Sequence, residues 1–477
     1  MERSVIDWDE SVYLLVSSSL VDGHLPYVEV WDHKQPFLYV LFAASFLAAD
    51  PIVGMRLLGC VAVAVTAVLL AGVSRRVFRG WFAPSVAAGL YVLATMSSGG
   101  LATNTEIIFA PFVVAACALL VFVPIDDLST REHHGMRFAA GGLICGLAIQ
   151  VKLIAAFEVV AIVGAATVLW WPTRWPFRRA ALLTMRRLLF FGLGALVPAV
   201  IAAGAYWLGG RFDEYVFANF VFNFAYSSAD VDTVGLARAA VSRQLNQGNM
   251  LLWILGLFAV PLALWWVRFD RHTLRLVVAG IGWLTAALAA VFATGKFYDH
   301  HFIQVLPPLV FLVTAVIVTT LQRPHAITKA LAVIMLVATV LVQATRSGRV
   351  LNREIELADD PRAVGLYLAG HVNAGEVIYV ANAQPIVYVL SGAKSPSRFV
   401  LPTWVIRPEI RDRLGLDLIG FLNQVFRQRP SYVVMELDNP WLPDRGFVEL
   451  LSSQYLDGEY EPEARFGSTL VFRRIQD

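Results

Sequence analysis

The residues best suited to chemistry lie near the N-terminus, in the polar stretch 7–36. This stretch contains six acidic residues, two histidines and one lysine, namely Asp7, Asp9, Glu10, Asp22, Glu29, Asp32, His24, His33 and Lys34. A carboxylate can take a proton from a hydroxyl group, and a cation can stabilise the charge that develops on a departing phosphate. Because polar loops on a rigid scaffold often carry catalysis, we expect this first loop to form the floor of an active site.

The rest of the chain must supply that scaffold, and its composition is that of a membrane protein. Of the 477 residues, 57% are hydrophobic and 16% are charged, and the mean hydropathy is +0.63. Soluble domains are about 45–50% apolar and about 25% charged. Apolar runs recur up to about residue 345, and a bilayer core needs ~20 such residues for each crossing. The chain is therefore predicted to be a polytopic α-helical membrane protein.

Charge and cysteine placement exclude other classes. A net charge of +2, with no basic cluster on a soluble segment, argues against a nucleic-acid partner. Cys60, Cys117 and Cys145 all fall in apolar runs without CxxC spacing. We therefore expect neither disulfides nor cysteine metal ligands.

The hydrophobic pattern predicts the elements that position the first loop. A short amphipathic helix is expected at 10–21, with Asp9 at its start, and an interfacial or re-entrant helix at 37–48. About ten membrane spans then follow, at roughly 53–74, 82–97, 105–123, 138–151, 153–171, 188–209, 249–267, 276–294, 302–321 and 326–344. The aromatic segment Tyr215–Tyr226 is expected to lie at the membrane interface, as a helix at a lipid entrance or as part of an aromatic belt.

Arginine and lysine predict the orientation of these spans. One set of alternate loops is rich in these residues: 75–79, 131–137, 174–187, 268–275 and 323–329. The opposite set is poor in them, with Lys296 alone between 295 and 301. The rich set should face the cytoplasm, so the first loop and the C-terminal region should share the outer side.

The composition changes after residue 345. Charges return, and short apolar runs predict strands at 376–381, 431–437 and 470–474 and helices at 360–371 and 408–427. We therefore expect two domains: a transmembrane domain at 1–345, with its catalytic first outer loop at 7–36, and a small soluble α/β domain at 346–477.

Several short motifs occur in a familiar order. They are Asp9-Glu10, Gly23-His24-Leu25-Pro26-Tyr27, Trp31-Asp32-His33-Lys34-Gln35-Pro36, Met55-Arg56-Leu57, Thr103-Asn104-Thr105-Glu106, Gly146-Leu147-Ala148 with Lys152, and His300-His301 through Pro307-Pro308. In this order, residues 7–345 resemble the C-type glycosyltransferases that use polyprenyl-phosphate sugars. The nearest families in this resemblance are the protein O-mannosyltransferases and the lipid A aminoarabinose transferases.

The resemblance implies an integral protein of a bacterial inner (plasma) membrane, with its active site and C-terminal domain on the periplasmic side. It implies transfer of a hexosyl or pentosyl group from a polyprenyl-phosphate-linked sugar to a glycan, lipid or protein acceptor. These families also begin with a span before the acidic loop, which is missing here, so we expect an apolar segment encoded upstream of Met1.

Two places offer catalytic carboxylates. The resemblance maps the catalytic aspartate of the family onto Asp9, beside Glu10; the alternative is that Asp9 caps a helix and Glu10 complements its dipole. Glu106 is the second candidate, although Thr103 to Glu106 also fits a capping box. A single inverting displacement needs one carboxylate as base, whereas double displacement needs a second as nucleophile.

Six cations are candidates for binding the donor phosphate. They are Lys34, Arg56, Lys152, Lys296, His300 and His301. The alternative for the lysines and Arg56 is contact with lipid headgroups. His300 and His301 lack a third ligand at fixed spacing, so no metal ligands are predicted, and no cofactor is assigned. The sequence leaves open whether the protein binds a divalent metal.

Two non-enzymatic classes compete with this hypothesis. A transporter would also have many spans, but it should show internal repeats or paired broken helices, and neither is visible. A polysaccharide-assembly or sensor protein could use the C-terminal domain for binding.

Overall fold

The computed structural model describes residues 3–78, 80–123, 134–173, 175–227, 232–245, 249–266, 271–373, 375–439, 442 and 444–475. Five helical segments in this part of the chain are long and apolar enough to cross a membrane: Pro51–Val77, Phe177–Leu208, Leu274–Ala293, Asp299–Leu321 and Ala326–Ala369. Six shorter apolar helices accompany them: Pro36–Leu47, Phe82–Ser97, Thr105–Leu120, Gly135–Ile149, Leu153–Leu169 and Met250–Pro261. The predicted helical membrane fold is confirmed.

The chain forms two units. One unit contains Met1–Leu58, Ala205–Asp230 and Glu354–Asp477, and the other contains Gly59–Gly204 and Val231–Arg353. We call them the loop unit and the bundle unit. The first loop therefore shares a unit with the C-terminal region. The boundary predicted at residue 345 falls inside the continuous helix α16 (Ala326–Glu356) and stays a prediction.

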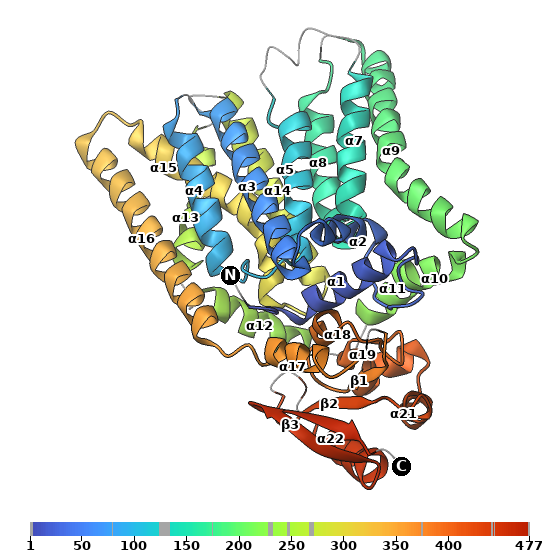
Figure 1. Cartoon of the computed structure of the whole chain (residues 1–477). Coiled ribbons are helices and arrows are strands. Elements are labelled where there is room, and N and C mark those ends of the chain that lie inside the picture. Colours follow the sequence, from blue (N-terminus) through green and yellow to red (C-terminus); the bar gives the residue numbers. More distant parts are fainter. Residues whose placement is uncertain are drawn as a thin grey trace. The chain divides into compact units, whose positions relative to one another are not determined.

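The bundle unit is a set of packed apolar helices. α5 (Thr105–Leu120), α7 (Gly135–Ile149) and α8 (Ala156–Leu169) contact one another and run alongside each other in Figure 1. The segment Asp299–Leu321 is buried throughout its best apolar window, so it is the centre of the unit. The remaining helices are α3 (Pro51–Val77), α4 (Phe82–Ser97), α9 (Phe177–Leu208), α12 (Thr233–Gln244), α13 (Met250–Trp266), α14 (Arg271–Ala293) and α15 (Leu306–Leu321).

Small residues let two of these helices approach closely. A Cβ atom added at Gly142 of α7 would lie 2.0 Å from the carbonyl oxygen of Phe191, and one at Gly146 would lie 2.4 Å from that of Ala195. Apolar side chains gain little by leaving lipid for a neighbouring helix, so close backbone packing is what holds membrane helices together. The Gly146 motif therefore has a packing role between α7 and α9.

The loop unit combines the first loop with a small sheet. The sheet has the order β1-β2-β4-β3; β1 and β2 are parallel and the other pairs are antiparallel (Figure 1). Its strands are β1 (Ile378–Val380), β2 (Tyr432–Glu436), β3 (Tyr460–Phe466) and β4 (Thr469–Arg474). Its helices are α1 (Trp8–Val21), α2 (Pro36–Ala43), α10 (Phe212–Val216), α11 (Phe222–Ser227), α17 (Asp360–Ala369), α18 (Ile386–Ser391), α19 (Pro402–Ile406), α20 (Pro408–Arg411), α21 (Leu418–Arg427) and α22 (Arg445–Leu451).

The sheet cores hold parts of the first loop. Trp8 packs on a core that contains Val433 and Leu422, while Leu15 and Val30 pack on a second core that contains Val434. The main-chain N–H of Trp31 also donates a hydrogen bond to the carbonyl oxygen of Arg398 at 2.8 Å. The α/β segment thus supports the predicted catalytic loop directly.

The secondary-structure predictions for the C-terminal region are partly confirmed. β1 and β2 fall within the predicted strands, β4 begins one residue before the predicted strand 470–474, and α17 falls within the predicted helix 360–371. A single helix over 408–427 is wrong. Gly415 has a φ of 66°, which ends the first helical segment, and the Asp417 side chain accepts a hydrogen bond from the N–H of Gly420 to start α21.

Candidate functional site

The start of α1 places two adjacent carboxylates in different environments. The N-cap is Asp7, whose side chain accepts a hydrogen bond from the N–H of Asp9 at 3.2 Å. Glu10 completes the capping box, since its Oε1 accepts from the N–H of Asp7 at 3.3 Å and from that of Ile6 at 2.6 Å. Asp9 is therefore not the N-cap, although it lies with Glu10 in the acidic first turn of α1.

Glu10 is bound by Arg56. The guanidinium donates to both carboxylate oxygens of Glu10, at 2.5 and 2.6 Å, and the Glu10 side chain is fully buried. This bidentate geometry is the strongest form of an arginine–carboxylate contact. Both residues were predicted as site residues. In the structure the charges of Glu10 and Arg56 neutralise each other, and the pair connects α1 to the start of α3.

Asp9 remains partly exposed beside Lys34. The Asp9 side chain is 31% exposed, and its Oδ2 lies 4.0 Å from Nζ of Lys34. The same oxygen accepts a hydrogen bond from the hydroxyl of Tyr13 at 2.9 Å. One face of this carboxylate is positioned by α1 while another reaches solvent, as a base that receives a substrate proton requires.

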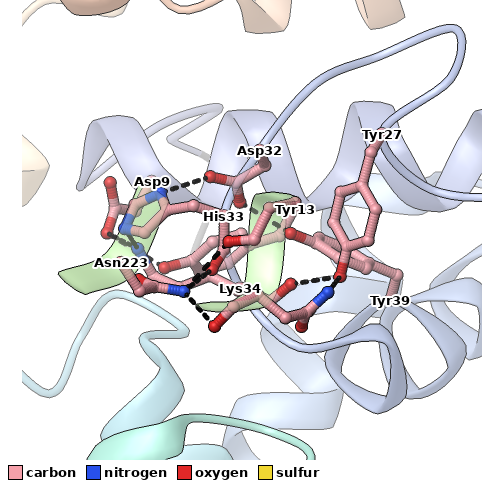
Figure 2. A network of polar contacts seen from close by, with 10 residues as sticks. Asp9, Tyr13, Tyr27, Asp32, His33, Lys34, Tyr39 and Asn223 are labelled. Carbon is pink, nitrogen blue, oxygen red and sulfur yellow. Dashed lines mark hydrogen bonds and ion pairs between the residues drawn. The ribbon is translucent and has the colours of Figure 1, made fainter. Parts of the chain in front are cut away.

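Lys34 ends a chain of polar contacts in the loop before α2 (Figure 2). The hydroxyl of Tyr39 donates to Oδ2 of Asp32 at 2.8 Å, Oδ1 of Asp32 lies 3.1 Å from Nδ1 of His33, and Nε2 of His33 lies 3.1 Å from Nζ of Lys34. Asp32, His33 and Lys34 are all more than nine-tenths buried. Asp32 and His33 belong to the predicted motif but were not predicted as site residues.

Burial and charge set the protonation of this chain. Burial opposes ionisation of Asp32, but the hydrogen bond from His33 and the charge of Lys34 outweigh it and lower its pKa to about 2. Burial and the charge of Lys34 lower the pKa of His33, which keeps its imidazole neutral. The chain therefore contains an anion, a neutral ring and a cation.

A second set of residues holds the loop backbone. The hydroxyl of Tyr27 donates to the carbonyl oxygen of Lys34 at 2.5 Å, and Asn219 Nδ2 donates to that hydroxyl at 3.2 Å. Asn223 Nδ2 donates to the carbonyl oxygen of His33 at 2.9 Å. Both asparagines come from the aromatic segment predicted for the membrane interface. They are the only side-chain amides in that segment, and this is the feature of the sequence that could have indicated a polar role for them.

The bundle unit brings together the other predicted residues. Nζ of Lys152 lies 2.5 Å from Oε1 of the fully buried Glu106, and Oε2 of Glu106 accepts from the hydroxyl of Thr105 at 2.9 Å. The N-cap of α5 is Asn104, without a capping hydrogen bond from its side chain, so the capping box predicted as an alternative for Glu106 is not formed. Lys296 lies in the turn that precedes His300, where its main-chain N–H donates to Oγ1 of Thr294 at 3.4 Å.

The same cluster has a donor set that suits a metal. One ligand atom each from Glu106, His300 and His301 lies within 4.8 Å of the others. Two imidazoles and one carboxylate are a known zinc ligand set. The third ligand that the sequence did not show is thus Glu106, 194 positions before His300 in the chain. Lys152 competes for the same carboxylate, since its ammonium already contacts Oε1.

Comparisons with known proteins agree with this fold. The family model for dolichyl-phosphate-mannose-protein mannosyltransferase matches residues 11–212. No curated protein sequence matches the chain. The structure is similar to ArnT from Cupriavidus metallidurans, both bound to undecaprenyl phosphate (TM-score 0.60, 14% identity) and in the apo state (TM-score 0.61, 15% identity). Each match covers 99% of this chain and 94% of the ArnT chain.

The chain therefore has the membrane fold of the C-type glycosyltransferases, which confirms the resemblance indicated by the first-loop motifs. Within that class, it is similar over nearly its whole length to ArnT. The matched family segment begins directly after Asp9 and Glu10 and includes the Lys34 chain, Arg56, Glu106 and Lys152.

Proposed function

We propose that this chain is a membrane glycosyltransferase that moves a sugar from a polyprenyl-phosphate donor to an acceptor hydroxyl. The observation that carries the proposal is the arrangement of Asp9 and Lys34: a partly exposed carboxylate lies 4.0 Å from a lysine that a neutral histidine holds in place. A base and a cation at this spacing are the two groups that transfer from a phosphate requires. The similarity to an ArnT structure described as bound to undecaprenyl phosphate supports the choice of donor.

Lys34 is proposed to bind the donor phosphate. Its neighbour His33 is neutral, so the contact at 3.1 Å positions the ammonium without cancelling its charge. As the bond between the anomeric carbon and the phosphate oxygen breaks, negative charge grows on the phosphate. A cation fixed beforehand at this point stabilises the transition state more than the ground state.

Asp9 is proposed to be the general base. The acceptor hydroxyl transfers its proton to the Asp9 carboxylate while its oxygen bonds to the anomeric carbon, and the bond electrons leave with the polyprenyl phosphate. A retaining double displacement would need a second carboxylate as nucleophile. The adjacent Glu10 is fully buried and held by Arg56, so the geometry favours a single inverting displacement.

The bundle cluster, considered by itself, is proposed to contact phosphate. Lys152, Lys296, His300 and His301 keep the role of phosphate contacts predicted from the sequence, and Glu106 orients Lys152 through its contact at 2.5 Å. Arg56 is instead assigned to positioning α1, because Glu10 occupies its guanidinium. A divalent cation held by Glu106, His300 and His301 would supply positive charge at the same cluster.

The first loop and the C-terminal region are proposed to lie on the outer, periplasmic side of a bacterial inner membrane. The arginine-rich loops support this orientation. A membrane-impermeant maleimide should label a cysteine introduced at Ser395 but not one introduced at Thr173. The opposite labelling would reverse the orientation.

The transfer reaction itself can be tested with purified protein in lipid nanodiscs. We expect release of undecaprenyl phosphate from one member of a panel of undecaprenyl-phosphate hexoses and pentoses when membrane glycolipids are offered as acceptors. Lys34→Ala should raise the KM for the donor because the phosphate loses its cation. Lys394→Ala, at an exposed lysine of the C-terminal region, is the matched control and should leave the KM unchanged. Binding of undecaprenyl phosphate that is equal in the Lys34→Ala and unmodified proteins would contradict the assignment.

A further inference from the structure

We infer that Asp32 and His33 form a tautomer lock that positions Lys34, and that aromatic residues including Trp404 of the C-terminal region hold this lock in place. Asp32 and His33 are positioning residues, because they act through Lys34 and do not contact the substrate. The inference rests on the proposed function, in which Lys34 binds the donor phosphate.

The hydrogen-bonding capacity of each group determines the direction of the chain. A lysine ammonium has only donors, so Nε2 of His33, at 3.1 Å, must accept from Lys34. Nδ1 then carries the ring proton and donates to Oδ1 of Asp32 at 3.1 Å. The second oxygen of Asp32 accepts from the hydroxyl of Tyr39 at 2.8 Å. Only the Nδ1–H tautomer of His33 satisfies both neighbours.

The choice of a histidine has an electrostatic consequence. A carboxylate in contact with Lys34 would hold the ammonium equally well but would neutralise it. The charged groups that face His33 are Lys34, Asp32 and Asp9, and burial together with the Lys34 charge favours the neutral ring. The lock thus fixes the position of a full positive charge, which stays available for a phosphate.

The aromatic neighbours fix the plane of the His33 ring. The ring centroids of Trp404, Tyr226 and Phe222 lie 5.2, 5.3 and 5.6 Å from that of His33, and Trp404 is perpendicular to it. Trp31 also packs edge-to-face against Trp404, with centroids 5.2 Å apart. Among the described residues, the buried indole nitrogen of Trp404 has no hydrogen-bond partner, so the contribution of Trp404 is its ring.

The main chain of His33 is held separately. Asn223 Nδ2 donates to its carbonyl oxygen at 2.9 Å, and the hydroxyl of Tyr27 donates to the carbonyl oxygen of Lys34 at 2.5 Å. With backbone, ring plane and tautomer all determined, Lys34 keeps one N–H on His33. This contact limits the directions in which its other two N–H groups can point. Oδ2 of Asp9 lies 4.0 Å from the same ammonium.

The test uses three substitutions in the full-length protein, with binding of undecaprenyl monophosphate in nanodiscs as the probe. His33→Phe keeps the ring packing and removes both nitrogens. His33→Gln keeps an acceptor for Lys34. Asp32→Leu removes both carboxylate oxygens, so Nδ1 of His33 loses its acceptor. His24→Phe is the matched control, since His24 lies in the same loop, half exposed, 4.0 Å from Glu29.

We expect His33→Phe and Asp32→Leu to weaken binding about 10-fold or more, the order for loss of a hydrogen bond to a charged group. His33→Gln should stay within about threefold of the unmodified protein, and so should His24→Phe. A merely structural role would not produce rescue by glutamine.

A second measurement does not depend on the donor. The ring nitrogen chemical shifts of ¹⁵N-labelled histidine distinguish the two tautomers, and the His33 signals are those absent from His33→Phe. We expect Nδ1–H in the unmodified protein and a larger fraction of Nε2–H in Asp32→Leu. If the unmodified protein does not bind undecaprenyl monophosphate, the proposed function fails. If it binds and Lys34→Ala weakens binding while His33→Phe does not, the lock alone is overturned, as it is by an Nε2–H ring in the unmodified protein.

Discussion

Lys34 of the loop unit and Lys152 of the bundle unit are both largely buried and both lie near a carboxylate, but the spacing of the charges differs. Lys34 is 4.0 Å from a carboxylate that is 31% exposed, and a neutral imidazole lies closer, at 3.1 Å. Lys152 is 2.5 Å from the carboxylate of Glu106, which is fully buried. The first cluster positions a charge without cancelling it, whereas the second cancels it.

The difference in charge spacing predicts different roles for the two pairs in catalysis and in stability. A buried ion pair adds little net stability over an apolar pair, but breaking it leaves an uncompensated charge. A loosely paired base and cation contribute little to stability and remain able to act on a substrate. We therefore expect substitutions in the Asp9–Lys34 pair to change the rate, and substitutions in the Glu106–Lys152 pair to change folding as well.

The largest effect is expected for Asp9→Asn. The amide keeps the shape of the side chain but cannot accept the proton, and general-base catalysis contributes about 10²–10⁴-fold. We expect kcat to fall by that order, with binding of undecaprenyl phosphate and the thermal midpoint largely unchanged. Asp22→Asn, at an exposed aspartate of the same loop, is the control. Transfer near the unmodified rate would remove Asp9 from the mechanism.

Glu106→Gln should act on stability. Because Lys152 loses its partner in a buried setting, the expected cost is about 3–5 kcal/mol of unfolding free energy. Denaturation of detergent-solubilised protein measures this loss. The double variant Glu106→Gln with Lys152→Met should recover most of it, since no buried charge is then left unpaired. Full stability of Glu106→Gln alone would show that the pair is solvated and would break the contrast with Asp9.

Asp32 gives the loop unit a dependence on acid. Its pKa is lowered from 3.8 to about 2 in the folded protein, so its stabilisation is fully present above pH 3.8 and is lost as the pH falls through 2. At 1.36 kcal/mol per unit this amounts to about 2 kcal/mol. Between pH 4 and pH 2 the unmodified protein should therefore lose about 2 kcal/mol more than Asp32→Asn. Equal losses would place the titration elsewhere.

The smallest effect concerns the helix cap. Asp7→Ala removes the side chain that accepts from the N–H of Asp9, and loss of an N-cap costs about 1 kcal/mol. Asp7→Ser should retain most of that stability. Because Asp9 is held also by Tyr13, transfer should fall only slightly. A loss as large as that of Asp9→Asn would instead identify Asp7 as the catalytic carboxylate.

Local patterns predicted much of this structure. The long apolar runs predicted the helical membrane fold, and short apolar runs predicted three of the four strands. β3 was missed because Tyr460–Phe466 is a charged edge strand without apolar alternation, which becomes extended by pairing with β4. The break between α20 and α21 was missed because Gly415 was not interpreted as a helix end.

The candidate site was predictable where its residues are close in sequence. Asp9 and Lys34 belong to recognisable motifs, and adjacent helical positions were expected to point in different directions, as Glu10 does towards Arg56. Asn223 and Trp404 could not be found this way, because they reach the first loop only after folding. Glu106 and His300 were each predicted as site residues, but no local spacing indicated that they lie together.

The segment that supplies the two asparagines contains a π-helical turn, Phe217–Val221, between α10 and α11. A π turn carries one residue more than an α turn would need. Deleting a single residue there would restore α geometry and rotate everything that follows by about 100°. Asn219 would still face Tyr27, but the amide that now meets the backbone of His33 would turn away, although every residue type is retained. A relative that keeps the extra residue can keep the second amide on the loop, whereas a relative that lacks it must support the histidine in another way. The length of this segment is therefore a marker of both ancestry and activity.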